Sequence, residues 1–238
     1  MLEVKDLQAG YEYLQVIWNA SLNVSPGEFV VLIGPNGAGK TTILRSIAGI
    51  LKPKAGEVRF MGTSIGGLSA DQISNMGICY ITEDLNLFTG MSVRENLLLG
   101  AYSVREARKI RETLEFVFNL FPVLKERQKQ SAGTLSGGER KMLAIGRGMM
   151  GSPKVFLIDE PSLGLAPRMA LAVFDALSEL NRRGDTILVV EQNVSTSLRL
   201  TQRGYVLEQG RIVLEGKSAD LLGNKYVNEV YLGLGRAA

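Results

Sequence analysis

The residues best suited to chemistry form one glycine-rich stretch at residues 34–41, with the sequence Gly-Pro-Asn-Gly-Ala-Gly-Lys-Thr. It matches the pattern G-x-x-x-x-G-K-[ST] and lies between the apolar run 29–33 and an amphipathic segment. Glycine lets the backbone turn at positive φ and bring its N–H groups close to an anion. The start of a helix adds free N–H groups and the positive end of its dipole. The stretch therefore predicts a loop that binds phosphate groups.

Two side chains of this loop add charge and metal chemistry. The ammonium of Lys40 can neutralise the outer phosphates of a nucleotide. The hydroxyl of Thr41 can occupy one position around Mg²⁺, a cation that prefers oxygen ligands and usually keeps water. A glycine-rich turn with an incidental lysine is the plainer alternative, but the strand-to-helix context favours the phosphate site.

A pair of carboxylates follows a second apolar run. Residues 155–161 predict a buried strand that carries Asp159 and Glu160 at its C-terminal end, where the ligands of open α/β sheets bind. Successive residues of a strand point to opposite faces, so the two carboxylates suit different tasks. We expect Asp159 to support Mg²⁺ and Glu160 to orient or deprotonate a water molecule.

Three further features could complete such a site. The Ser-Gly-Gly sequence at residues 136–138 precedes a strong helical pattern and suits a second anion, although it is also a common helix cap. Glu83 lies in an acidic loop after the apolar run 77–81. Tyr11, or its neighbour Tyr13, could stack on a purine ring or cover a sheet edge.

The composition is that of a soluble globular protein, with 238 residues, 45% hydrophobic and 21% charged. The net charge of +3 is too small to indicate nucleic-acid binding. The sequence has no apolar stretch near the length of a membrane span and no signal-peptide pattern at Met1, so we expect a cytoplasmic protein. The absence of histidine excludes Ser-His-Asp chemistry and an imidazole base. Cys79 lies in an apolar run and is expected in the core.

The apolar pattern predicts the elements that position these groups. Residues 2–7 and 20–24 alternate apolar and polar residues, as in a partly exposed antiparallel sheet. Continuous apolar runs predict buried strands, and they occupy residues 29–33, 77–81, 155–161 and 186–190. Helical spacing dominates residues 92–150, and residues 204–208 and 211–215 predict a hairpin.

The predicted fold class is therefore α/β, with a mostly parallel sheet, an N-terminal antiparallel β subdomain and a helical subdomain. We expect one domain over residues 1–238. Its nucleotide-binding core would comprise residues 1–86 and 151–238, and its helical lobe residues 87–150.

Taken in order, the phosphate loop, the sequence Leu-Ser-Gly-Gly-Glu at residues 135–139 and the acidic strand end resemble the ATP-binding subunit of an ABC transporter. The resemblance covers essentially the whole chain and implies a P-loop ATPase core. It implies ATP and Mg²⁺ as cofactors, and two subunits packed head to tail. Each ATP would then lie between the phosphate loop of one subunit and residues 136–138 of the other.

The resemblance also implies roles for individual residues. The expected nucleotide contacts are Tyr11, Val16, Gly34, Asn36, Gly37, Ala38, Gly39, Lys40, Thr41, Thr42, Ser136, Gly137 and Gly138. The expected Mg²⁺ ligands are Thr41, Glu83 and Asp159. The expected catalytic residues are Lys40, Glu160 and Gln192.

Three positions depart from the usual pattern of this family. Glu83 stands in place of a glutamine, Ala166 in place of an aspartate and Gln192 in place of a histidine. The sequences Glu-Pro-Ser-Leu-Gly-Leu-Ala-Pro at 160–167, Val-Glu-Gln-Asn at 190–193 and Val-Tyr-Leu-Gly at 230–233 resemble one subgroup. This subgroup is the ATPases of branched-chain amino acid importers, with urea and short-amide importers as close relatives.

The resemblance further implies integral-membrane permease subunits as partners, and through them an extracytoplasmic substrate-binding protein. The ATPase partner would be a second copy or a related subunit, and the chain would lie on the inner face of the cell membrane. We expect residues 83–86, with Leu87 and Phe88, to form the floor of a groove that receives a permease helix.

Two alternatives to a transport ATPase remain. One is an ABC-type ATPase that acts on nucleic acid or ribosomes, which the lack of a long coiled-coil insertion disfavours. The other is a regulatory nucleotide-binding module, which has no need of Glu160.

Overall fold

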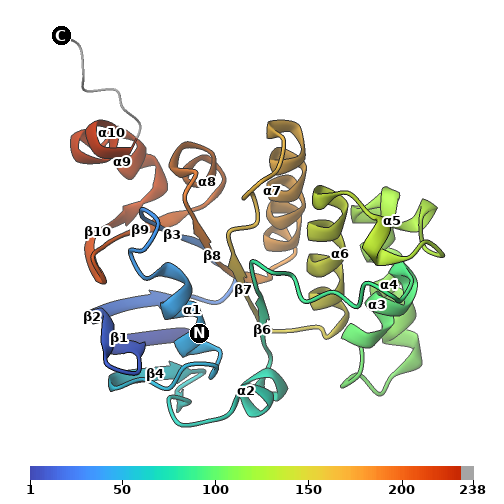
Figure 1. The fold of residues 1–238 in the computed structure, drawn as a ribbon, viewed down its shortest axis with the longest axis horizontal. Helices are drawn as coiled ribbons and strands as arrows, with labels where there is room; N and C mark the ends of the chain where they lie inside the picture. The colour runs from blue at the N-terminus through green and yellow to red at the C-terminus, as the bar shows by residue number, and fades with distance from the viewer. Residues whose placement is uncertain (232–238) are drawn as a thin grey trace.

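The computed structural model describes residues 1–231, so Leu232 and Gly233 of the C-terminal pattern lie outside the described residues. The described chain forms two sheets, one of six strands and one of four, with helices around them (Figure 1). The predicted α/β class with an antiparallel N-terminal part is confirmed.

The six-stranded sheet has the strand order β10-β9-β3-β8-β7-β6. Its strands are β3 (Phe29–Ile33), β6 (Ile78–Ile81), β7 (Val155–Asp159), β8 (Thr186–Glu191), β9 (Arg203–Glu208) and β10 (Arg211–Lys217). All neighbours pair in parallel except β9 and β10, which form the predicted hairpin. Because the pairing is parallel, the carboxyl ends of β3, β7 and β8 meet at one edge, with Ile33 opposite Glu191 and Asp159 opposite Val190.

Burial explains the continuous apolar runs of this sheet. Every residue of β3 and β8 is buried, as expected for parallel strands covered on both faces. Val31 and Ile33 belong to one buried cluster with the helices of residues 93–198, whereas Val30 and Leu32 join a second cluster with the antiparallel sheet. The sheet therefore separates two buried cores, one on each face.

The antiparallel sheet has the order β2-β1-β4-β5. Its strands are β1 (Leu2–Tyr11), β2 (Leu14–Val24), β4 (Ala55–Phe60) and β5 (Thr63–Ser64). β1 and β2 extend beyond the predicted ranges 2–7 and 20–24. Shifts in their pairing register interrupt the alternation of apolar and polar residues before either strand ends. Asp6 and Asn19 adopt positive φ of 47° and 51° within these strands, which breaks the period-two pattern without ending the strand.

The helices pack against the six-stranded sheet or form the lobe beside it. They are α1 (Lys40–Ile47), α2 (Ala70–Met76), α3 (Val93–Gly100), α4 (Ala107–Leu120), α5 (Pro122–Glu126), η1 (Ala132–Thr134), α6 (Gly137–Met150), α7 (Pro167–Arg182), α8 (Val194–Leu200), α9 (Ser218–Gly223) and α10 (Lys225–Tyr231). Helices α3 to α6 lie together at one end of the molecule (Figure 1), and the exact division at residues 86 and 150 stays a prediction. Helix α8 is not indicated by the apolar pattern, because it is short and rich in serine and threonine.

Candidate functional site

The phosphate loop connects β3 directly to α1. Gly39 precedes α1 with φ of 107°, and a Cβ at this position would overlap the side chain of Ile17 on β2. A larger residue would therefore strain the backbone and displace the loop from the antiparallel sheet. The sequence prediction of a strand, a glycine turn and a helix is confirmed here.

Lys40 is the buried charge of this loop, with 4% of its surface exposed. Its Nζ donates to the carbonyl oxygens of Gly34 at 2.9 Å and Pro35 at 3.3 Å, and it lies 3.1 Å from Oε1 of Glu160. The start of the loop is thus hydrogen-bonded to the lysine near its end. The ammonium is held between the backbone and a carboxylate, in reach of both.

Asp159 connects β7 to the phosphate loop. One carboxylate oxygen accepts from the hydroxyl of Thr41 at 3.0 Å, and the other accepts from the hydroxyl of Tyr80 at 2.8 Å. Burial raises the pKa of Asp159 above its usual value, and these two hydrogen bonds oppose the rise. Tyr80 was not among the predicted residues. Only the pairing of β6 with β7 brings its hydroxyl here, although a tyrosine in an otherwise apolar strand is a usable signal.

Glu160 lies just beyond β7 and adopts a positive φ of 44°. Its carboxylate therefore does not follow the strand alternation, which predicts opposite faces for Asp159 and Glu160. Both side chains instead reach the same loop, since Asp159 contacts Thr41 and Glu160 contacts Lys40. A non-glycine residue at positive φ costs free energy, and such strain is common where a side chain must be aimed.

A cavity of about 520 Å³ lies beside the loop. Its lining includes many of the predicted nucleotide and metal contacts, namely Tyr11, Val16, Asn36, Gly37, Gly39, Lys40, Thr41, Thr42, Glu83 and Glu160. Leu14 and Leu163 also line it and were not predicted. Gly34, Ala38 and Asp159 do not line the cavity. Gly34 accepts from Lys40, Ala38 accepts from the N–H of Gly210, and Asp159 accepts from Thr41.

Tyr11 presents its ring at this cavity. It ends β1, is 38% exposed, and its hydroxyl accepts from Nη1 of Arg45 at 3.2 Å. Tyr13 is fully exposed and does not line the cavity. We therefore expect Tyr11→Ala to weaken ATP binding by about 1 kcal/mol, the order of one aromatic stacking contact.

Nucleotide titration of three proteins checks this expectation. Tyr11→Phe should bind ATP as the parent does, because the ring remains, and Tyr13→Ala serves as the control. Equal dissociation constants for Tyr11→Ala and the parent would remove Tyr11 from the site.

Residues 136–138 do not line this cavity. Ser136 caps α6, and its backbone N–H donates to Oε2 of Glu139 at 2.9 Å in a reciprocal capping box. Ser136 and Gly137 are exposed, so this helix start is free to meet another molecule. Within one chain, the two predicted phosphate sites are therefore separate.

Gln192 also lies outside the cavity lining. Gln192 is exposed, and its backbone N–H donates to Oε2 of the buried Glu191 at 3.1 Å. The neighbouring Glu191 follows the predicted strand 186–190 and carries no signal of burial in the sequence, yet it is 1% exposed. The contact of Gln192 with a phosphate stays a prediction.

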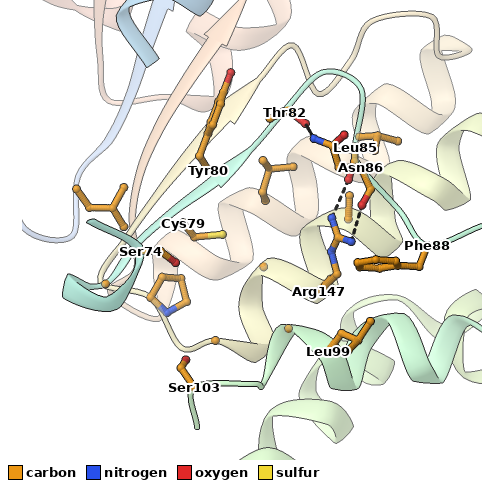
Figure 2. Close-up of a pocket in the computed structure, with 18 residues that line it drawn as sticks. Ser74, Cys79, Tyr80, Thr82, Leu85, Asn86, Phe88, Leu99, Ser103 and Arg147 are labelled. Carbon is orange, nitrogen blue, oxygen red and sulfur yellow. Dashed lines mark hydrogen bonds between the residues drawn. The ribbon is translucent and has the colours of Figure 1, made fainter. Parts of the chain in front are cut away.

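A second cavity, of about 370 Å³, opens between the six-stranded sheet and the helical lobe. Figure 2 shows Arg147 of α6 at its centre, with the guanidinium donating to the carbonyl oxygens of Asn86 at 2.7 Å and Leu85 at 2.8 Å. The ring of Phe88 lies 5.8 Å from this guanidinium and is 53% exposed. Of the predicted floor, Leu85, Asn86 and Phe88 line the groove.

The rest of that predicted floor lies elsewhere. Glu83, Asp84 and Leu87 line a neighbouring cavity of about 460 Å³, together with Gly137 and Arg140. Glu83 therefore borders both this cavity and the one beside the phosphate loop. Residues of the loop 83–88 therefore line all three cavities, the one beside the phosphate loop, the one around Arg147 and the one beside Gly137.

Comparison with known proteins places these features in a family. Residues 17–163 match the family model described as ABC transporter. The chain is 42% identical over 233 residues to the high-affinity branched-chain amino acid transport ATP-binding protein BraG of Pseudomonas aeruginosa, covering 98% of this chain and 100% of that protein. Two solved structures are also similar. One is an ATP-binding cassette of an ABC transporter in its ADP conformation, with 28% identity, 98% coverage of both chains and a TM-score of 0.85. The other is a dimeric cassette bound to ADP and phosphate, with 25% identity, 92% and 99% coverage, and a TM-score of 0.82.

Proposed function

Because this chain belongs to the ABC transporter family and is an ATPase of that family, we propose that it powers the import of branched-chain amino acids through separate permease subunits. The observation that carries this substrate class is the 42% identity, over essentially both full lengths, to a branched-chain amino acid transport protein. The cavity beside the phosphate loop supports the ATPase role independently, because it gathers Lys40, Thr41 and Glu160.

The residues at the loop suit ATP and Mg²⁺. Tyr11 and Val16 would contact the adenine, and the backbone and Lys40 would contact the phosphates. The hydroxyl of Thr41 and the carboxylate of Asp159, 3.0 Å apart, are oxygen donors of the kind that Mg²⁺ prefers, and Glu83 lines the same cavity as Thr41. In residues 1–231, no group of three or more histidine, cysteine or acidic side chains forms a metal cage. Mg²⁺ typically uses one or two carboxylates with water and phosphate, and when bound it neutralises phosphate charge.

The chemistry of hydrolysis would be divided between two residues. Glu160 would orient or deprotonate the attacking water, since it is the carboxylate that faces both the cavity and Lys40. Lys40 would stabilise negative charge on the transferred phosphoryl group. Gln192 would position a phosphate through its neutral amide, a weaker contact than that of a charged donor.

We further propose that the working ATPase is a dimer, with a second copy or a related subunit. Ser136, Gly137 and Gly138 would then contact the ATP held by the partner, which would account for their absence from the lining of the cavity in this chain.

Among residues 1–231, none of the helices has the length and apolar character needed to span a bilayer. The chain would lie at the inner face of the membrane through its permeases, and would meet a substrate-binding protein only indirectly.

Transport by an assembled complex tests the substrate class. The chain would be reconstituted in liposomes with the permease subunits that co-purify with it and with their binding protein, and the uptake of labelled leucine, valine and urea measured. We expect ATP-dependent uptake of leucine and valine. Uptake of urea alone would assign the chain to a urea importer and contradict the proposal.

The groove of Figure 2 is the proposed docking site for a short permease helix. Phe88 and Leu99 expose 53% and 40% of their surfaces at this groove, and such apolar surface suits the contact face of an amphipathic helix. We expect Phe88→Glu to uncouple ATP hydrolysis from transport in the assembled complex. The matched control is Ile50→Glu, which changes a side chain of similar exposure, 56%, outside the groove.

Two rates decide the outcome, namely ATP hydrolysis and substrate uptake in the same liposomes. Uncoupling means that uptake falls while hydrolysis continues. Normal uptake by the Phe88→Glu complex would place the permease contact elsewhere.

A further inference from the structure

A buried lysine lies directly behind the proposed catalytic carboxylate. Lys141 of α6 is 7% exposed, and its Nζ donates to the backbone carbonyl oxygen of Glu160 at 2.6 Å. Lysine is rarely buried in this way, and none of the phosphate or metal contacts described above requires it. Its burial therefore indicates a separate task.

The charges of four carboxylates act on this ammonium. Burial lowers the pKa of Lys141, whereas the charges of Glu191, Glu83, Glu160 and Asp159 act to raise it. A buried charge without such partners costs several kcal/mol. The carboxylates thus offset part of the cost of burying this ammonium.

Glu191 holds the same segment from the other side. It is 1% exposed at the end of β8, and it accepts from the backbone N–H and the hydroxyl of Ser162, both at 2.9 Å. It also accepts from the backbone N–H of Gln192 at 3.1 Å and of Asn193 at 3.4 Å. One carboxylate therefore ties the segment after Glu160 to the segment that carries Gln192.

The backbone of Glu160 needs such support. Its φ of 44° is unfavourable for a residue with a Cβ, and its N–H donates to the carbonyl oxygen of Val190 at 3.0 Å. Its carbonyl oxygen accepts from Lys141 and also from the N–H of Leu163 at 3.2 Å, so both polar groups of this residue's backbone are held. The side chain can then aim at Lys40, 3.1 Å away.

We propose that Lys141 and Glu191 are positioning residues that hold Glu160 in its orientation for ATP hydrolysis. Through Lys141, the orientation of Glu160 is coupled to α6, the helix whose start carries Ser136, Gly137 and Gly138. A shift of this helix when it meets the partner's nucleotide would reach the catalytic carboxylate through one side chain. This inference rests on the proposed function of Glu160.

The test compares Lys141→Met with the double variant Lys141→Met/Glu191→Gln. Methionine keeps an unbranched stem but donates no hydrogen bond to Glu160. Single-turnover hydrolysis at saturating ATP, the dissociation constant for ATP and the midpoint of thermal unfolding are measured for each. Lys129→Met, which changes an exposed lysine, is the control.

We expect Lys141→Met to hydrolyse ATP about 10- to 100-fold more slowly, as for a misplaced catalytic group, with ATP affinity changed less than about threefold. The double variant should also hydrolyse ATP slowly, and its unfolding midpoint should fall further, because Glu191 accepts four hydrogen bonds that a glutamine cannot all accept. A loss of ATP affinity in parallel with the loss of hydrolysis in Lys141→Met would show a general structural role and overturn the inference.

Two further outcomes separate this inference from the proposed function. A Glu160→Gln protein that hydrolyses ATP at the parent rate would overturn both together. An inactive Glu160→Gln protein beside a fully active Lys141→Met protein would overturn the positioning role alone.

Discussion

Glu160→Gln should reduce ATP hydrolysis by about 100-fold or more while ATP binding persists, because a general base typically contributes 10²–10⁴-fold. The glutamine oxygen can still accept from Lys40, so the geometry of the loop survives. The amide cannot accept the proton of an attacking water. With ATP bound and not hydrolysed, we expect the protein to accumulate as a dimer that encloses nucleotide.

Size-exclusion chromatography with ATP and Mg²⁺ measures the dimer, and single-turnover kinetics measure the chemistry. Glu112→Gln is the control, since Glu112 pairs with Arg108 on the surface of α4. Gln192→Ala should lower turnover only partially, because a neutral amide positions without proton transfer. A Glu160→Gln protein that remains monomeric with ATP would contradict the proposed dimer.

Gly210→Ala should destabilise the protein strongly, although Gly210 lies outside the cavity. Gly210 turns the β9–β10 hairpin at φ of 75°, and a Cβ there would overlap the carbonyl oxygen of Val16. Its N–H donates to the carbonyl oxygen of Ala38 at 2.9 Å, and its own carbonyl accepts from Trp18 at 2.8 Å. The alanine methyl would therefore push the hairpin away from the phosphate loop.

We expect a loss of about 2–5 kcal/mol in the free energy of unfolding, from overpacking together with the cost of left-handed backbone. ATP affinity should fall as well, because the support of Ala38 is displaced. Gly62→Ala is the matched control, since Gly62 has a similar φ of 81° with no atom within 4 Å of an added Cβ. It should cost about 1 kcal/mol. Equal shifts of the two unfolding midpoints would mean that backbone strain alone explains the loss.

Local sequence predicts the phosphate loop well, because β3, the glycine turn and α1 are adjacent in the chain and each carries its own signal. The same holds for the carboxylates after β7 and for the β9–β10 hairpin. The contacts among these elements depend on sheet order, which brings Tyr80 to Asp159 and Glu191 to Ser162 across long sequence separations.

Some features contradict the simple patterns from which they would be predicted. The alternation of a strand predicts opposite faces for Asp159 and Glu160, but the positive φ of Glu160 turns both toward one loop. Lys141 would be expected on a helix surface, but it is buried and donates to the backbone carbonyl of Glu160. These departures occur at the proposed site, where strain and buried charge serve function.

The strand order also sets when the site can form during protein synthesis. β3, which leads into the phosphate loop, pairs with β8 and β9, and the ribosome makes both of these strands long after β3. At typical translation rates, β3 waits roughly ten to thirty seconds for these partners. A ligand stabilises a protein by binding to its folded state. Nucleotide therefore cannot stabilise the phosphate loop before these strands have paired. During that interval the unpaired edges of β3 are open to other chains, and cellular chaperones would be most useful then.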